Sequence, residues 1–289
     1  MCIRDRLIKA RLEEKKQLQS ESAYLQQVPY KQLADMDCVE RTRDKELKVR
    51  ELHRFYGVSS LANLPGVKAF EVSFRCGAEK EASSYALAAW LRCAEMHAAE
   101  VQTAPFDRKR LKEEIVEIRA LSMKEPEEFV PELKGLLAEC GIVLVLLPHF
   151  PKSYANGAVF WPRRDKAVLV LSIRRKWADI FWFSLFHEIG HLMLHPGKTF
   201  IDDERAIADP ARKEEEKKAD EFAEDSLIAI ERLNEFFAKA DFSQEAITEF
   251  SREAGIAAGI VVGRLQHEGL LKHNSELNRI RSRYEWKDR

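Results

Sequence analysis

The chain has 289 residues, of which 45% are hydrophobic and 33% are charged, and its formal net charge is −1. This length is enough for a sizeable core and predicts two domains. The near-zero net charge gives no global electrostatic argument for binding to nucleic acid or to a membrane surface.

The five cysteines are odd in number, scattered, and include no C-x-x-C pair. They are Cys2, Cys38, Cys76, Cys93 and Cys140. This spacing argues against a disulfide framework and against a cysteine-based zinc site, and it favours a reducing compartment. The N-terminus is charged and lacks the apolar core of a signal peptide. We therefore expect a cytoplasmic protein without a membrane partner.

Helical patterns dominate the first half of the chain. Gly57 is placed to stop the second of these helices, and Asp107 is placed to cap the fourth. The predicted helices cover residues 7–26, 46–58, 84–102, 107–122 and 129–141. We expect residues 1–105 to form a helical N-terminal region.

The pattern changes after residue 141, where short apolar runs predict β-strands. These runs cover residues 141–148, 157–162 and 166–172. The last two runs are predicted to form a hairpin, and Pro162 suggests that the first arm of this hairpin is an edge strand. A long apolar helix should follow at 177–195, then a helix at 211–237 and two shorter helices. Residues 106–289 are thus predicted to be an α+β domain.

The long helix carries the sequence H-E-x-x-H at His187, Glu188 and His191. Helix geometry places the two histidines about 40° apart around the axis and about 6 Å apart along it, so both can bind one metal ion. Glu188 projects beside that line, where it can reach a water on the metal. This is the arrangement of zinc hydrolases, in which two histidines bind Zn²⁺ and the glutamate takes a proton from the water.

The third ligand must come from elsewhere in the chain. His195 would lie about 12 Å along the axis from His187, too far to share an ion, so it is expected in the second shell or the core. The acidic segment at 214–226 offers Glu216 as ligand. Asp220, four residues later, could then accept the N–H of a ligating histidine. Glu215 and Glu221 stay open as alternatives to Glu216.

Several segments together resemble the ImmA/IrrE family of zinc metallopeptidases of bacteria and phages, over about residues 107–289. The segments are GAVFWP, KAVLVLS, FWFSLFHEIGHLMLH, EKKADEFA and GIVVGRLQHEG. The resemblance implies a zincin-like, gluzincin-type domain with Glu216 as zinc ligand. The chain departs from the family pattern at Lys217-Lys218 and at Ser226-Leu-Ile-Ala229, neither of which touches the proposed ligands.

The resemblance also implies partners. Relatives that act as proteases cleave Xre-type transcriptional repressors, and some relatives with an Xre/HigA-type module are described as antitoxins. Many carry an N-terminal helix-turn-helix. The opening residues MCIRDR resemble a translated sequencing adapter, with an ordinary disordered tail as the alternative. If they are an adapter, we expect that DNA-binding module to be missing here. DNA binding is expected only through that module.

Catalysis would also need a group that stabilises an oxyanion. Tyr154, Arg264 and His267 are candidates, each with an ordinary packing or surface role as the alternative. The hairpin is expected to offer its edge arm to an extended substrate. A competing reading starts from residues 247–271, which resemble a helix-turn-helix. On that hypothesis the chain is a DNA-binding regulator, but the second helix is apolar and is expected to pack in the core. A third hypothesis is a non-catalytic antitoxin that binds its partner without turnover.

Overall fold

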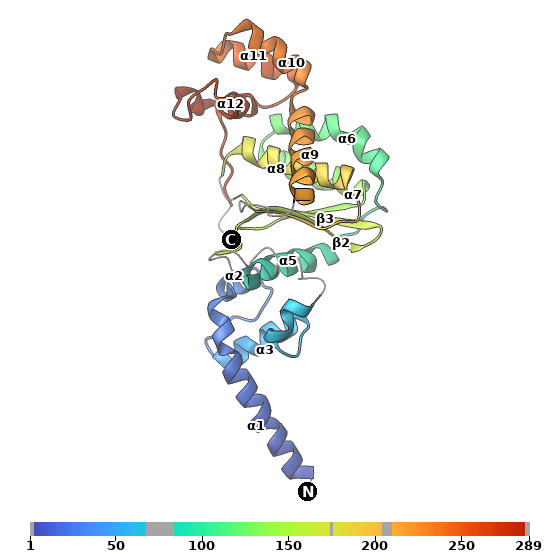
Figure 1. Ribbon diagram of the computed structural model, residues 1–289, viewed down its shortest axis with the longest axis vertical. Coiled ribbons are helices and arrows are strands. Elements are labelled where there is room, and N and C mark those ends of the chain that lie inside the picture. Colours follow the sequence, from blue (N-terminus) through green and yellow to red (C-terminus); the bar gives the residue numbers. More distant parts are fainter. Residues whose placement is uncertain (1–2, 68–83, 174–175, 204–209, 287–289) are drawn as a thin grey trace. The chain divides into compact units, whose positions relative to one another are not determined.

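A computed structural model describes residues 3–67, 84–173, 176–203 and 210–286 (Figure 1). Cys2 and Cys76 lie outside these ranges. The contacts divide the chain into two units. Unit 1 comprises Met1–Ala99 and His149–Tyr154, and unit 2 comprises Glu100–Pro148 and Ala155–Arg289.

Unit 1 is helical, as its sequence predicts. Its helices are α1 (Ile3–Glu21), α2 (Tyr30–Asp35), α3 (Lys45–Tyr56) and α5 (Ser84–Ala99), with 3-10 turns at Ser22–Gln26 and Leu61–Gly66. α3 ends as predicted, because Gly57 adopts a left-handed φ of 68° that suits glycine. α2 has no counterpart among the predictions, since six residues show too little periodicity. α5 is buried along most of its length, including Trp90 and Cys93.

Unit 2 has the predicted α+β fold, built on a four-stranded mixed sheet. The strands are β1 (Ile142–Leu146), β2 (Ala155–Arg163), β3 (Lys166–Leu171) and β4 (Phe200–Asp203), in the order β1-β3-β2-β4. β1 runs parallel to β3, whereas β2 runs antiparallel to both β3 and β4. Four helices lie on one side of this sheet in Figure 1, namely α6 (Arg108–Ala120), α7 (Pro126–Glu139), α8 (Ala178–Leu194) and α9 (Pro210–Leu227).

The prediction that residues 157–162 form an edge strand is wrong. β2 lies inside the sheet, because the additional strand β4 pairs with Ala155–Val159. Pro162 is tolerated because it lies beyond this pairing, where the β2–β3 register is also irregular. The edges of the sheet, among the described residues, are β1 and β4.

α8 runs through the core of unit 2 and α9 packs closely along it. A side chain at Gly190 would meet the backbone of Ala219 at 3.2 Å, so the two helices approach at a glycine and an alanine. Ala219 and Ala223 form the buried face of α9. Glu216 stands about one turn before Ala219 and is therefore carried against α8.

The single helix predicted at 211–237 is instead two helices, α9 and α10 (Ile230–Lys239). The chain breaks where Ile228 enters the core. The Asp225 side chain then accepts a hydrogen bond of 3.3 Å from the backbone N–H of Ile230. A buried apolar residue and this side-chain hydrogen bond thus lie at the interruption of a segment whose composition favours continuous helix.

The helix-turn-helix-like segment forms α11 (Gln244–Ala254) and α12 (Ala258–His267), joined at Gly255 with a φ of 69°. A 3-10 turn follows at Glu276–Ile280. The apolar residues of α12 pack into the core of unit 2: Ile260, Val261, Val262 and Leu265. A recognition helix needs an exposed face for the DNA groove, so this burial argues against the DNA-binding reading.

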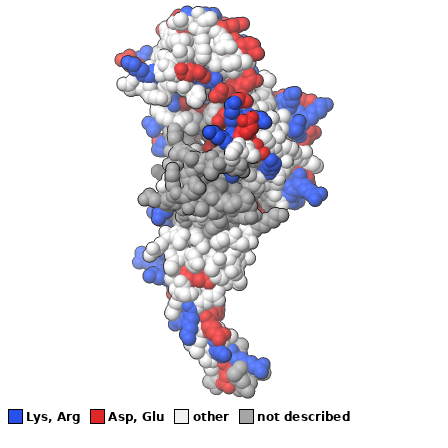
Figure 2. Space-filling model, viewed as in Figure 1, with Lys and Arg blue, Asp and Glu red and all other residues white. Residues whose placement is uncertain are grey.

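Neither sign of charge dominates the face of the described residues that Figure 2 shows. On the face seen in Figure 2, acidic and basic side chains are interspersed. No helix within the described ranges has the length and apolarity that crossing a membrane requires.

Candidate metal centre

α8 and α9 bring His187, His191 and Glu216 to one point. The two Nε2 atoms lie 3.0 Å apart, and Glu216 Oε2 lies 3.2 Å from each of them. Both histidines are buried, because α8 carries them into the core. Two imidazole nitrogens and a carboxylate oxygen are a donor set that zinc uses in catalytic sites. The residues present therefore fit a divalent metal ion.

Asp220 is placed to orient the first histidine. Its Oδ1 lies 2.8 Å from His187 Nδ1, which is the contact expected from the i, i+4 spacing to Glu216. A carboxylate there favours a proton on Nδ1 and leaves the Nε2 lone pair free for a metal ion. His191 is held differently, by stacking its ring on Phe200 of β4 at 3.9 Å between centroids.

The histidines and carboxylates of this cluster shift one another's pKa values. Burial acts to lower the pKa of His187, but the Asp220 and Glu216 carboxylates outweigh it and raise that pKa to about 11. Burial acts to raise the pKa of Glu216, but its hydrogen bonds with His187 and His191 lower it to about 2. An imidazolium thus compensates the carboxylates when no cation is bound, and a metal ion would take over that role.

Glu188 is fully buried beside the two histidines. Neither carboxylate oxygen has a hydrogen-bond partner among the described residues. Burial raises the pKa of Glu188 well above its ordinary value, and the positive charge on His187 opposes this only in part. β2 makes room for the carboxylate with a glycine, since a Cβ at Gly157 would come within 2.3 Å of Glu188 Oε1. A buried, unpaired carboxylate of this kind is typical of a general base.

A cleft of about 500 Å³ opens next to the donor set. Its polar lining residues include Asn156, Ser184, Asp202, Asp220, Glu224, Arg264 and His267, and its apolar ones include Ile180, Phe183, Leu227 and Ile260. This volume lies in the range of ligand-binding sites. Because Asp220 also contacts His187, the cleft gives a substrate access to the same region.

The remaining candidates have different surroundings. His195 caps the end of α8, and its ring packs 5.9 Å from His191 and 5.3 Å from Phe200, outside the donor set. Glu215 forms an ion pair with Lys198, and Glu221 is exposed beside Lys217, so neither of these alternatives to Glu216 joins the histidines.

The three oxyanion candidates are divided between the units. Arg264 and His267 line the cleft. The guanidinium of Arg264 is engaged with Glu224 at 2.9 Å and with Glu268 at 2.8 Å. Tyr154 belongs to unit 1 and has a φ of 54°. Stabilisation of an oxyanion by any of them stays a prediction.

Three residues near the site have no counterpart in the sequence predictions. Arg212 Nε lies 3.5 Å from Glu216 Oε1, one helical turn away, so helix spacing could have found it. Asp202 acts electrostatically on His187 and Glu188, but it lies in β4, a strand too short to recognise. Gly157 has no side chain that could have marked it in the sequence as part of the site.

Comparison with known proteins agrees with this geometry. The sequence model of one protein family, described as the IrrE N-terminal-like domain (peptidase M78), matches residues 138–266. The match includes β1–β4, α8 and α9, and therefore every residue of the donor set. A search of the curated proteins finds no match.

Proposed function

Because residues 138–266 carry a peptidase domain of the M78, or ImmA/IrrE, family, we propose that this chain is a zinc-dependent endopeptidase that cleaves a regulatory protein. We place the activity in residues 106–289. The observation that carries the proposal is the buried, unpaired carboxylate of Glu188 beside three converging metal-ligand atoms. A purely structural metal site has no use for such a group.

His187, His191 and Glu216 would hold the ion. When bound, Zn²⁺ supplies a Lewis acid that lowers the pKa of water and polarises the scissile carbonyl. Asp220 keeps the His187 ring in place through the 2.8 Å contact at Nδ1. Phe200 fixes the plane of the His191 ring. The protein thereby prepares the donor atoms before a substrate arrives.

Glu188 is the general base in this mechanism. Its carboxylate takes a proton from the attacking water and then delivers it to the nitrogen of the leaving amine, which breaks the peptide bond. The raised pKa suits this role, because a base that must also donate works best with a pKa near the operating pH. Gly157 allows the carboxylate to sit against β2.

The substrate would enter as an extended segment. The cleft beside Asp220 combines apolar walls with charged groups, which suits a peptide with mixed side chains. β4 is an edge strand among the described residues and contains Phe200 and Asp202, both close to the donor set. We propose that the substrate pairs along β4, in place of the first hairpin arm expected from sequence.

The substrate class rests on the family resemblance. An Xre-type repressor is the expected substrate, and a toxin is a possible binding partner. The alternative is a non-catalytic antitoxin or regulator that binds such a partner without turnover. Glu188 favours the enzyme, because binding alone requires no buried base.

The test compares zinc-loaded wild type with Glu188→Gln. Each would be co-expressed with the repressors and other proteins encoded beside its gene, and new protein termini would be detected by mass spectrometry. We expect wild type to cut a partner, and the variant to hold zinc but cut at least about a hundredfold more slowly. Glu221→Gln is the matched control, since Glu221 is exposed on α9.

Two outcomes would contradict the proposal. Full cleavage by zinc-loaded Glu188→Gln would show that another group is the base. A zinc-loaded wild type that binds a neighbouring protein tightly and never cuts it would favour the antitoxin reading.

A further inference from the structure

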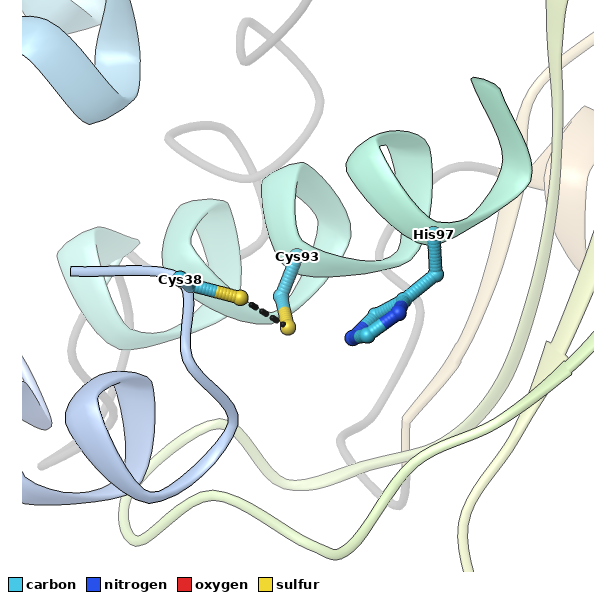
Figure 3. Close-up of side chains that lie close together, drawn as sticks. All are labelled: Cys38, Cys93 and His97. Atoms are coloured by element: carbon cyan, nitrogen blue, oxygen red, sulfur yellow. Dashed lines mark hydrogen bonds between the residues drawn. The ribbon is translucent and has the colours of Figure 1, made fainter. Parts of the chain in front are cut away.

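Unit 1 contains a second convergence of metal-binding side chains, formed by Cys38, Cys93 and His97 (Figure 3). One ligand atom from each residue lies within 4.8 Å of the other two. The cysteines are not joined in a disulfide, and their Sγ atoms lie 2.9 Å apart. Scattered cysteines without a C-x-x-C pair predict no cysteine-based zinc site, and Cys38 and Cys93 are 55 positions apart. The fold nevertheless brings them together.

Two of the three side chains come from one helix. Cys93 and His97 are four residues apart on α5, so both project from the same face. Cys93 is fully buried. Figure 3 shows the His97 ring beside the Cys93 sulfur, with one edge turned toward it. The spacing is the same as that of His187 and His191 on α8.

The third side chain is fixed by the end of α2. Asp37 adopts a left-handed φ of 57°, and the backbone N–H of Cys38 donates to Leu33 O at 2.9 Å. This is the hydrogen bond of a Schellman motif, which ends a helix with a defined geometry. Cys38 is therefore held in place by the backbone.

The surroundings of His97 distinguish a metal site from a simple pair of thiols. Its Nε2 is buried and has no hydrogen-bond partner among the described residues. A buried polar atom without a partner is costly, and such atoms point to a bound water or ion. A Cys38–Cys93 disulfide would use only the two sulfurs and leave this nitrogen unsatisfied, whereas a metal ion would use all three side chains.

We propose that Cys38, Cys93 and His97 form a second metal site, for a thiophilic ion such as Zn²⁺. Thiolate and imidazole ligands select such ions, and two cysteines with one histidine are an established zinc donor set. Two thiolates on one tetrahedral zinc ion stand about 3.8 Å apart, so the sulfurs must separate by about 1 Å on binding. The ion would fasten the end of α2 to α5 and leave its fourth position to water or another donor.

Cobalt substitution tests the proposal on the full chain, because this site contains sulfur and the α8 cluster of described residues does not. The reduced, metal-free protein would be titrated with Co²⁺, and the near-ultraviolet thiolate-to-cobalt charge-transfer band would be recorded. We expect two equivalents to bind and the band to appear. Cys38→Ser should lose the band and one equivalent, whereas Cys140→Ser, in unit 2, should keep both. His191→Ala should keep the band and lose the other equivalent.

A measurement on a chain with intact cysteines covers the case that Cys38→Ser fails to fold. X-ray absorption of the zinc remaining in His191→Ala should show sulfur neighbours at about 2.3 Å. The proposal is overturned if no band appears in the reduced protein, or if the band survives Cys38→Ser. It is also overturned if only one equivalent binds and mild oxidation links Cys38 to Cys93, because the pair is then redox-active.

Discussion

Two clusters of candidate metal ligands, one on α5 and one on α8, occur among the described residues, and they differ in their neighbouring residues. Each has two candidate ligands four residues apart on a buried helix and a third from a distant segment. Glu188 follows the first ligand on α8, whereas the buried Ala94 follows Cys93 on α5. The α8 cluster also has Asp220 at its first histidine and an adjoining cleft.

Metal ligands alone therefore do not make a catalyst. A hydrolytic site also needs a base that can reach water, and a space for the substrate. The α8 cluster has both, and the α5 cluster has an alanine where the base would stand. We therefore assign turnover to the α8 cluster alone, and the following variants are designed to separate the two.

The largest effect is expected from Glu216→Gln, which removes a ligand of the α8 cluster with little change of shape. Removing a group that only hydrogen-bonds a metal ligand typically lowers metal affinity by about 10–100-fold. Removing the ligand itself should lower the affinity of that cluster by more, and the cleavage rate should fall as well. Isothermal titration with Zn²⁺ measures the loss. The α5 cluster should keep its ion. If Glu215→Gln lost the metal instead, the ligand assignment would be wrong.

Asp220→Asn should have the next largest effect, because it weakens the partner that orients His187. We expect zinc affinity at the α8 cluster to fall by about 10–100-fold while the site still forms. Competition with a chromogenic chelator would measure it. Glu214→Gln, at an exposed position on the same helix, is the control. Equal zinc affinities of Asp220→Asn and wild type would exclude a role of Asp220 in orienting His187.

Gly157→Ala tests the contact between β2 and the base. The added methyl group would overlap Glu188 Oε1, so we expect a loss of about 1–3 kcal/mol in the free energy of unfolding and slower cleavage. Thermal unfolding monitored by circular dichroism gives the first quantity. Much of the loss should disappear in the Glu188→Ala background, where the overlap is absent.

Gly135→Ala is the matched control for Gly157→Ala. Gly135 lies inside α7 with open space around its Cα, so alanine should stabilise the protein by up to about 1 kcal/mol. If both alanines acted alike, the Gly157 effect would come from the backbone and not from Glu188.

The smallest expected effect is a loss of stability of unit 1 at low pH. The buried Glu21 carboxylate accepts hydrogen bonds from His53 at 2.7 Å and from the Leu61 N–H at 2.8 Å. Burial acts to raise the pKa of Glu21, but these hydrogen bonds prevail and lower it below 4.5. A lowered folded-state pKa contributes stability that is present above the unfolded value and is lost as pH falls through the folded value.

Lowering the pH from 5 to 3 should therefore weaken unit 1 through Glu21. We expect Glu21→Gln to remove about 1 kcal/mol at pH 6, or roughly 4–8 °C for a unit of this size, and less at pH 3. Hydrogen exchange resolved by segment would locate the change in α1 and α3. An undiminished effect of the variant at pH 3 would exclude the carboxylate charge as its cause.

Features that are local to one helix can be predicted from the sequence. Features that depend on contacts between distant segments cannot. His187, Glu188 and His191 follow from helix geometry, and the choice of Glu216 with Asp220 follows from spacing on the next helix. The α5 cluster depends on how α2 packs against α5, which no periodicity shows. β4 has only four residues, so it gives no strand pattern, and without it β2 looked like an edge.

In our proposal His187, His191 and Glu216 bind one metal ion in reach of Glu188. Anomalous X-ray scattering at the zinc edge, from crystals of the zinc-loaded full chain, would locate that ion. We predict a peak within about 2.0–2.2 Å of both Nε2 atoms and of a Glu216 oxygen. Zinc-loaded crystals without a peak there, or with the ion held by other side chains, would contradict the account.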